Sequence, residues 1–178
     1  MTLSEEVLQA LFSYFEPKEY HARELLVEGG SIAKYFYLVE EGVQALYMIT
    51  DKGEKAIAGF SYQGEQSGVF DSFISQKPST LFLEALTPSR LIAITKSDFD
   101  QLFEAFPEFY KWEAKFLEKI LFGRLSRETE MLTFSAKERF DAFMKRCPPE
   151  LLQIPQKYLA SYLNMKPETF SRLRALKD

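Results

Sequence analysis

The spacing of apolar positions divides the chain into a β-rich part and several helical parts. Between about residues 19 and 95 the apolar residues fall in short runs, separated by turn signals at Gly29-Gly30, Glu40-Glu41-Gly42 and Asp51-Lys52-Gly53. The last of these is a plausible hairpin connection. Short strands with turn signals at this spacing are typical of an all-β sandwich or barrel, so the sequence predicts such a unit here.

Helical spacing returns on both sides of this stretch. It predicts an amphipathic helix over residues 3–15, a short helix that ends before Pro107, and a long helix from Glu108 to about Thr133. A helix of about 25 residues is ~38 Å long, longer than a domain of ~100 residues needs to cover itself. We expect it to pack on its twin from a second subunit, and folding back on its own β-rich unit is the alternative. Its apolar side comprises Phe109, Trp112, Phe116, Ile120 and Leu121.

The residues after Phe134 predict three more helices. Ser135 with Glu138 three positions on forms a capping box for the first of them, which ends at Pro148-Pro149. The segments "PQKYLASYL" and "PETFSRLRALK" follow, joined by Asn164-Met165-Lys166. Two short helices joined by about three residues have helix-turn-helix geometry. Pro155 and Pro167 suit the first helical position.

Inside this helix pair, Asn164 suits the left-handed turn. Small Ala160 allows close approach, and the shared apolar contact comprises Leu159, Leu163, Phe170 and Leu173. On the second helix Glu168 and Arg172 lie four residues apart on one face. Arginine can bind guanine and glutamate can accept from cytosine where such a helix enters the major groove. An ordinary exposed ion pair on a terminal helix is the alternative.

Phosphate contacts are expected around these two residues. Thr169 and Ser171 can reach phosphate oxygens, and four cations add attraction that does not depend on sequence: Lys157, Lys166, Arg174 and Lys177. Residues 1–136 hold 13 Lys and Arg against 21 Asp and Glu, a net charge of −8, whereas residues 137–178 hold 9 against 5, a net charge of +4. This distribution suggests an acidic body with a basic binding end, although chance unevenness would look the same.

Composition excludes several classes of protein. The 178 residues are 46% hydrophobic, as in a folded globular chain. No apolar run approaches the roughly 18 residues of a membrane span, and the acidic start lacks the basic region of a signal peptide, so we expect a cytoplasmic protein with no membrane association. A single histidine, His21, argues against a histidine-rich metal site and a cupin-type enzyme. We therefore predict no enzymatic activity, metal or cofactor. The single Cys147 is either a redox switch or an ordinary free thiol.

The segment "IPQKYLASYLNMKPETFSRLRAL" closely resembles the helix-turn-helix of the cyclic-AMP receptor protein/FNR family of bacterial transcription regulators, and "PETFSR" is its most specific part. By position, Glu168 and Arg172 match residues that contact bases in that family, and Gln156 and Lys157 match residues that contact the DNA backbone. Asn164 stands where the family usually has glycine. Lys166 replaces a capping Ser or Thr.

The resemblance continues upstream through "LLVEGG" and "YFYLVEEGVQALY". It implies an α+β fold: a cyclic-nucleotide-binding-like jelly roll (double-stranded β-helix) of eight strands over residues 1–107, a dimerisation helix over 108–133, and a winged helix-turn-helix over 134–178. It implies a homodimer on double-stranded DNA, with RNA polymerase as a candidate protein partner. Because the chain ends within or just after the second helix of the pair, we expect any later extension to be absent.

The effector site departs from the family pattern. Gly68 and Ala85 fit the family's nucleotide cassette, but Val69 stands at its glutamate position, and Ser79 with Thr80 follows where arginine would pair with the cyclic phosphate. If Gly64-Glu65 is the pair instead, Ser75 stands at the arginine position, so neither register contains an arginine. A buried phosphate without a paired cation is costly. We therefore predict no tight binding of cyclic AMP or cyclic GMP at an effector pocket of Gly68, Val69, Ser79 and Thr80, and the effector is unknown. A β-roll that binds a ligand or protein and carries a vestigial helix-turn-helix is the alternative function.

Overall fold

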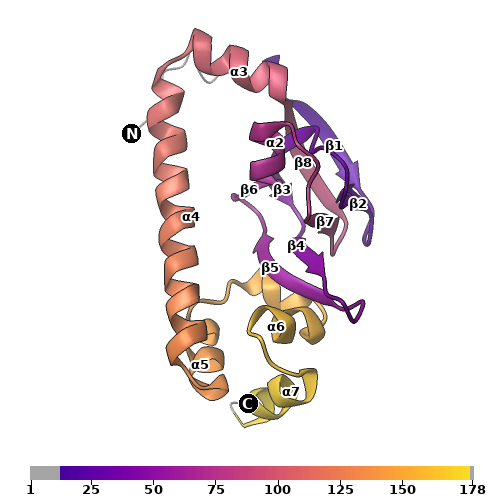
Figure 1. Ribbon diagram of the computed structural model, residues 1–178, viewed down its shortest axis with the longest axis vertical. Helices are drawn as coiled ribbons and strands as arrows, with labels where there is room; N and C mark the ends of the chain where they lie inside the picture. Colours follow the sequence, from indigo (N-terminus) through magenta and orange to yellow (C-terminus); the bar gives the residue numbers. More distant parts are fainter. Residues whose placement is uncertain (1–12, 177–178) are drawn as a thin grey trace.

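The structure is a computed structural model that describes residues 13–176 (Figure 1). Most of the helix predicted over residues 3–15 lies outside the described residues, as does Lys177. Three parts follow one another along the chain: a β-roll, a long helix beside it, and a helical unit at the far end of that helix. None of the helices within residues 13–176 is long and apolar enough to cross a bilayer.

The β-roll contains eight strands in two antiparallel four-stranded sheets, as the family resemblance implies. The order of the first sheet is β1-β8-β3-β6 and that of the second is β2-β7-β4-β5. Apart from β4 and β5, strands that are neighbours in a sheet are not consecutive in the sequence, as in a jelly roll. The bounds are β1 Glu16–Tyr20, β2 Leu25–Val27, β3 Tyr35–Glu41, β4 Gln44–Ile49, β5 Lys55–Ser61, β6 Gln66–Ser67, β7 Phe82–Ala85 and β8 Ser89–Thr95.

Two turns explain how the chain moves through the roll. The predicted hairpin joins β4 to β5, and Gly53 in it has φ +78°. Gly42 lies between β3 and β4, which belong to different sheets. Its φ is +93°, and a Cβ atom there would lie 2.4 Å from the Ser89 hydroxyl, so only glycine fits this crossing without strain. Pro17 lies in β1, an edge strand, where a missing N–H is tolerated.

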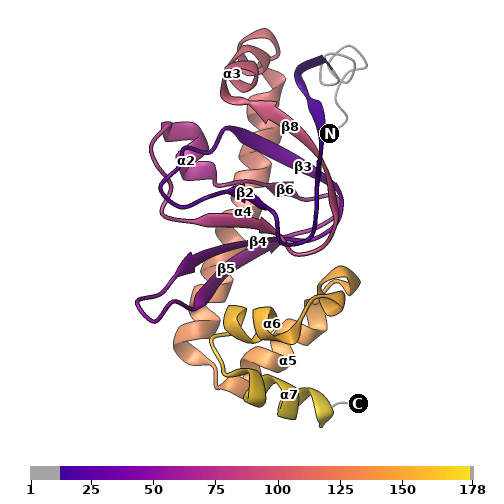
Figure 2. The ribbon, with the colours of Figure 1, turned by 90° about the vertical axis from the view of Figure 1, so that its right-hand side faces the viewer.

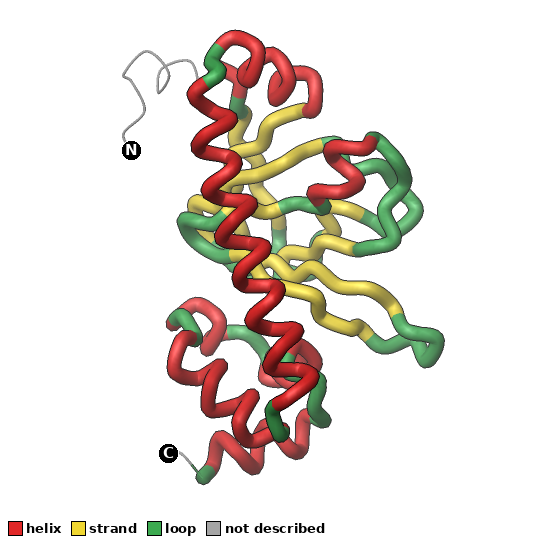
Figure 3. The backbone as a smooth tube through the Cα atoms, turned by 60° about the vertical axis from the view of Figure 1, so that its left-hand side comes forward, coloured by secondary structure: helices red, strands yellow, loops and turns green. Residues whose placement is uncertain are grey.

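Helix α4 runs along one side of the roll, with α3 at one end of the roll and the terminal helices at the other (Figures 2 and 3). The long helix has the predicted bounds, and the capping box of Ser135 and Glu138 is present. The six-residue helix α2 had no counterpart in the sequence prediction. No strand follows α7 within the described residues. The bounds are α2 Phe70–Ser75, α3 Lys96–Ala105, α4 Glu108–Thr133, α5 Ala136–Arg146, a 3-10 turn Pro149–Gln153, α6 Gln156–Tyr162 and α7 Pro167–Ala175.

Two large apolar clusters divide the molecule, one in the β-roll and one in the terminal helices. The first includes Phe109 of α4 as a buried member and Phe116 packed against it. The expectation that the Phe109 side of α4 meets a second subunit is therefore wrong at this end of the helix, where the helix folds back on its own β-roll. The second cluster joins α5, the 3-10 turn, α6 and α7 with Val43 from the roll.

Candidate nucleic-acid interface

The helix pair α6–α7 has the turn that the sequence predicts. Asn164 adopts a left-handed conformation with φ +50°, and the Met165 amide donates to the Ala160 carbonyl over 3.0 Å. Phe170 is fully buried, and its ring meets Phe140 of α5 edge-on with a centroid distance of 5.3 Å. Three further predicted core residues are buried beside it: Leu159, Ala160 and Leu163.

The starts of the two helices differ slightly from each other. Pro167 occupies the first helical position of α7, as predicted, and Lys166 is the N-cap without a side-chain capping bond. Helix α6 begins at Gln156, so Pro155 is its N-cap, one position before the predicted place. Both N-termini leave backbone N–H groups that can face an anion.

Arg139 of α5 holds the turn between the two helices from behind. Its guanidinium donates to the carbonyls of Leu163 (3.0 Å), Asn164 (3.3 Å) and Phe134 (2.7 Å). Carbonyl groups at the end of α6 would otherwise lack partners. The sequence analysis missed this role, because Arg139 lies 24 residues from Leu163 and no local pattern links the two.

Glu168 and Arg172 are both exposed on α7. Within residues 13–176 neither side chain forms an ion pair or a hydrogen bond, so the predicted alternative of an i,i+4 pair is not formed. Buried Phe170 fixes the opposite side of the same helix. Two charged groups are thus held outward by a packed core and stay available to an external partner.

The other predicted contact residues surround this pair. Gln156, Lys157, Lys166 and Ser171 are exposed, and Thr169 is half-buried. The Lys157 ammonium lies 5.1 Å from the centroid of the Tyr158 ring. All of these residues come from the first two turns of α6 or α7 or from the turn before α7.

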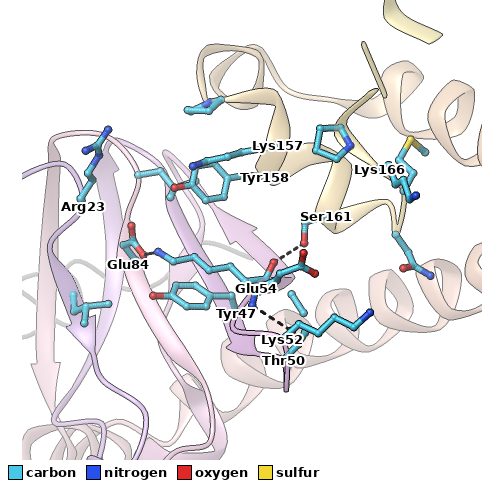
Figure 4. Close-up of a pocket in the computed structure, with 18 of the residues that line it drawn as sticks. Arg23, Tyr47, Thr50, Lys52, Glu54, Glu84, Lys157, Tyr158, Ser161 and Lys166 are labelled. Carbon is cyan, nitrogen blue, oxygen red and sulfur yellow. Dashed lines mark hydrogen bonds and ion pairs between the residues drawn. The ribbon is translucent and has the colours of Figure 1, made fainter. Parts of the chain in front are cut away.

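A cavity of about 1400 Å³ lies between part of the helix pair and the β-roll, and both Lys157 and Lys166 border it (Figure 4). On the roll side, Lys55 pairs with buried Glu84 and lies 4.4 Å from the Tyr47 ring centroid. Ser161 of α6 closes one wall. Its hydroxyl donates to the Lys55 carbonyl over 2.8 Å and accepts from the Ile57 amide over 3.1 Å. These two bonds tie α6 directly to β5.

Arg127 of α4 also holds α6 in place, beside the contact between α6 and β5. It donates to the Tyr162 carbonyl over 2.8 Å, and its guanidinium carbon lies 4.6 Å from the Tyr162 ring centroid. A few residues later, Glu130 pairs with Arg146 of α5 at 2.5 and 2.6 Å. The long helix therefore positions both the first and the second helix of the terminal unit that follows it.

The residues expected at an effector pocket are mostly packed. A Cβ atom on Gly68 would lie 2.6 Å from the Phe36 ring, and Val69 is fully buried. The buried Ser79 hydroxyl donates to the Leu81 carbonyl and accepts from the Leu81 amide, each over 2.8 Å. Thr80 is exposed. None of the four lines the cavity beside the helix pair.

Cys147 lies half-buried after α5, against the apolar cluster of the helix pair. Burial raises the pKa of its thiol, and this lowers the fraction of reactive thiolate at neutral pH. Within the described residues no three His, Cys, Asp or Glu side chains lie close enough together to hold a metal ion.

Comparison with known proteins agrees with this geometry. Residues 17–106 match the cyclic nucleotide-binding domain family. The chain is 26% identical to the fumarate and nitrate reduction regulatory protein of Yersinia pestis, over 97% of this chain and 73% of that protein. Among solved structures it is similar to FixK2 from Bradyrhizobium japonicum, with a TM-score of 0.78 and 18% identity over 91% of this chain and 83% of that one. It is also similar to CLP of Xanthomonas campestris, whose structure is described as that of a c-di-GMP responsive global regulator, with a TM-score of 0.76 and 18% identity over 98% and 92% of the two chains.

A cyclic-nucleotide-binding-type β-roll, a long helix and a terminal helix-turn-helix together define the class of protein: a DNA-binding transcription regulator. The chain belongs to the cyclic-AMP receptor protein/FNR family.

Proposed function

We propose that this protein regulates transcription as a homodimer that reads a near-palindromic DNA site through α7. The observation that carries the proposal is the pair of exposed charged side chains, Glu168 and Arg172, held outward by fully buried Phe170. Arg172 would bind guanine through O6 and N7, and Glu168 would accept from cytosine N4. Such a partner places the protein in the compartment that holds the chromosome.

The phosphate contacts in this proposal come from the helix starts around the base-reading pair. Gln156 and Lys157 at the start of α6, and Lys166, Thr169 and Ser171 at the start of α7, would bind backbone oxygens. These contacts set affinity and register without reading sequence.

The dimer contact is assigned to the exposed side of α4. Regulators of this family act as dimers, and α4 leaves a line of apolar side chains in solvent at spacings of seven, four, four and seven residues. They are Tyr110, Leu117, Leu121, Leu125 and Leu132. Leu121 is 55% exposed and Leu132 is 79% exposed, which is unfavourable unless a partner covers them. Twin helices packed along this line would place two copies of α7 about 34 Å apart, one turn of DNA.

The β-roll in this proposal does not take cyclic AMP or cyclic GMP tightly at the predicted effector pocket, because Val69 and Ser79 supply neither the acid nor the cation that the nucleotide requires. RNA polymerase is a further partner that transcription activation would require.

Selection from random duplex DNA tests the proposal. It should recover a site with two half-sites about one helical turn apart. Arg172→Ala should lose about 1–3 kcal/mol of discrimination at one base pair per half-site. Lys157→Ala should weaken all sequences alike and reduce the slope of log K against log[salt] by about 0.9 per lost phosphate contact.

Lys34→Ala is the matched control, since Lys34 is an exposed lysine in the loop before β3. It should leave both base preference and salt slope unchanged. A protein that dimerises but binds no duplex at low salt would instead support the vestigial helix-turn-helix. Loss of affinity in Arg172→Ala without any change of base preference would exclude base reading by this residue.

A further inference from the structure

A second, smaller cavity of about 80 Å³ lies between the first sheet and the elbow that α3 and α4 form. Six aromatic side chains contribute to its wall: Phe15, Phe36, Phe99, Phe103, Phe109 and Trp112. Five of these rings, those of Phe36, Phe99, Phe103, Phe109 and Trp112, contact one another in that order, with centroid distances from 4.5 Å for Phe99–Phe103 to 6.3 Å for Phe36–Phe99. Trp112 is 37% exposed, so its ring stands at the edge of this apolar wall.

One acid and one amide interrupt the aromatic lining. Glu113 of α4 and Gln66 of β6 are 6% and 9% exposed, and the Gln66 amide donates to Glu113 Oε2 over 3.3 Å. This leaves Gln66 Oε1 and Glu113 Oε1 buried, and neither accepts a hydrogen bond from residues 13–176. Buried oxygens without a donor are costly, because they lose water without replacing it.

The negative charge of the Glu113 carboxylate is also not balanced by a positive charge. Glu113 is the only titratable residue among those that line the cavity, and it forms no ion pair within the described part of the chain. Burial raises the pKa of its carboxyl, as expected for a carboxylate that has lost water without gaining a cation. The cavity thus lacks two hydrogen-bond donors and one positive charge.

We propose that this cavity binds a small organic ammonium ion, or the ammonium end of a longer amine. An ammonium group supplies the donors that the two oxygens lack and the charge that Glu113 lacks. Aromatic faces attract such cations electrostatically and solvate their carbon atoms, as in the aromatic cages that bind methylated ammonium groups. A water molecule occupies about 30 Å³ in the liquid, so a cavity of about 80 Å³ admits a ligand of about three heavy atoms.

The proposal is independent of DNA reading, since residues of α3 and of the first turns of α4 line the cavity, and this end of α4 is opposite to the helix pair (Figure 1). It places a ligand against the first turns of the helix that also carries Arg127 and Glu130. The ligand would therefore change how tightly α4 is held on the β-roll.

Tryptophan fluorescence tests the site directly, because Trp112 is the only tryptophan of the chain. The full-length protein is titrated with ethylammonium chloride up to 100 mM at pH 8, against sodium chloride of the same ionic strength and against ethanol, a neutral molecule of the same size. A ligand of three heavy atoms binds no more tightly than the millimolar range. We expect a saturable change with ethylammonium and none with sodium chloride or ethanol.

Glu113→Gln keeps the shape of the side chain and removes its charge, so it should weaken ethylammonium binding at least tenfold. Glu118→Gln, an exposed glutamate on the same helix, should bind as the unsubstituted protein does. Equal responses to ethanol and ethylammonium would overturn the proposal without reference to any variant. A response that survives unchanged in a folded Glu113→Gln protein would overturn it too, as would the lack of a saturable response in the unsubstituted protein.

Discussion

Phe170 is the side chain on which the helix pair depends most. Its truncation to alanine should unfold the terminal helices and leave the β-roll folded. Phe170 is fully buried and packs edge-on against Phe140. Removal of a buried phenylalanine ring costs about 3–5 kcal/mol. At about 0.05–0.15 kcal/mol per residue, a unit the size of residues 134–176 is stable by about 2–6 kcal/mol. The loss is as large as the stability, so Phe170→Ala should leave the terminal unit largely unfolded.

Two probes distinguish the two halves in a urea titration. Far-UV circular dichroism reports the helices, of which α5, α6 and α7 contribute a substantial part. Fluorescence of Trp112 reports the β-roll, because that ring lies beside the roll cluster. In Phe170→Ala we expect reduced ellipticity before urea is added and no DNA binding. The midpoint of the Trp112 transition should stay where it is in the unsubstituted protein.

Leu176→Ala is the matched control, since Leu176 is 78% exposed just after α7. Its effect on either transition should be within about 0.5 kcal/mol. A Trp112 midpoint that falls in Phe170→Ala together with DNA binding would refute the reasoning. It would mean that Ser161 and Arg127 couple the helix pair and the β-roll into one cooperative unit.

Three further changes test single features of the fold. Glu113→Gln should raise the urea midpoint at neutral pH, because the raised pKa of Glu113 means that its ionised form destabilises the folded protein. This gain in stability should vanish as the pH falls toward the ordinary glutamate pKa of about 4.3. A gain that persists at acidic pH would contradict the prediction. Asn164→Gly should leave the melting temperature nearly unchanged, whereas Asn164→Val should lower the free energy of unfolding by about 1–2 kcal/mol. Equal melting temperatures for the two variants would argue against the left-handed turn. Ser135→Ala should lower the free energy of unfolding by about 1 kcal/mol, because the capping box is lost. Ser126→Ala, at an exposed position on α4, is the control and should not lower this free energy by a similar amount.

The sequence predicts best those features whose signal is local. The bounds of α4, the capping box at Ser135 and the left-handed turn at Asn164 each depend on residues within one or two helical turns. The eight strands came from the family resemblance, since the strand-like runs between residues 19 and 95 suggest only a sandwich or barrel. The base-reading assignment of Glu168 and Arg172 stays a prediction that the proposed selection experiment tests.

Local sequence patterns do not predict contacts between residues that are far apart in the chain. Gln66 and Glu113 are 47 residues apart, and Ser161 reaches the Lys55 carbonyl across 106 residues. Neither contact has a sequence signal, because each polar residue looks like an ordinary surface position in its own element. The apolar positions of α4 illustrate the same limit. Helical periodicity identifies them as apolar, but it does not show that Phe109 would face the β-roll of its own chain.

Helix α4 is the physical link between the two halves, and its side chains reach both of them. Glu113 lies under the elbow with α3, and Arg127, 14 residues later and so about 21 Å along the axis, holds Tyr162 of α6. A rigid helix transmits a rotation or shift along its whole length, since its backbone hydrogen bonds resist local bending. A change in how the first turns of α4 sit on the β-roll must therefore be absorbed at Arg127 and Glu130, where the helix pair is held. The helix pair is joined to the β-roll by the Ser161 hydrogen bonds and by Val43 and Phe60, which pack in the same apolar cluster as Phe170, so such a shift would reach the core of the helix pair as well.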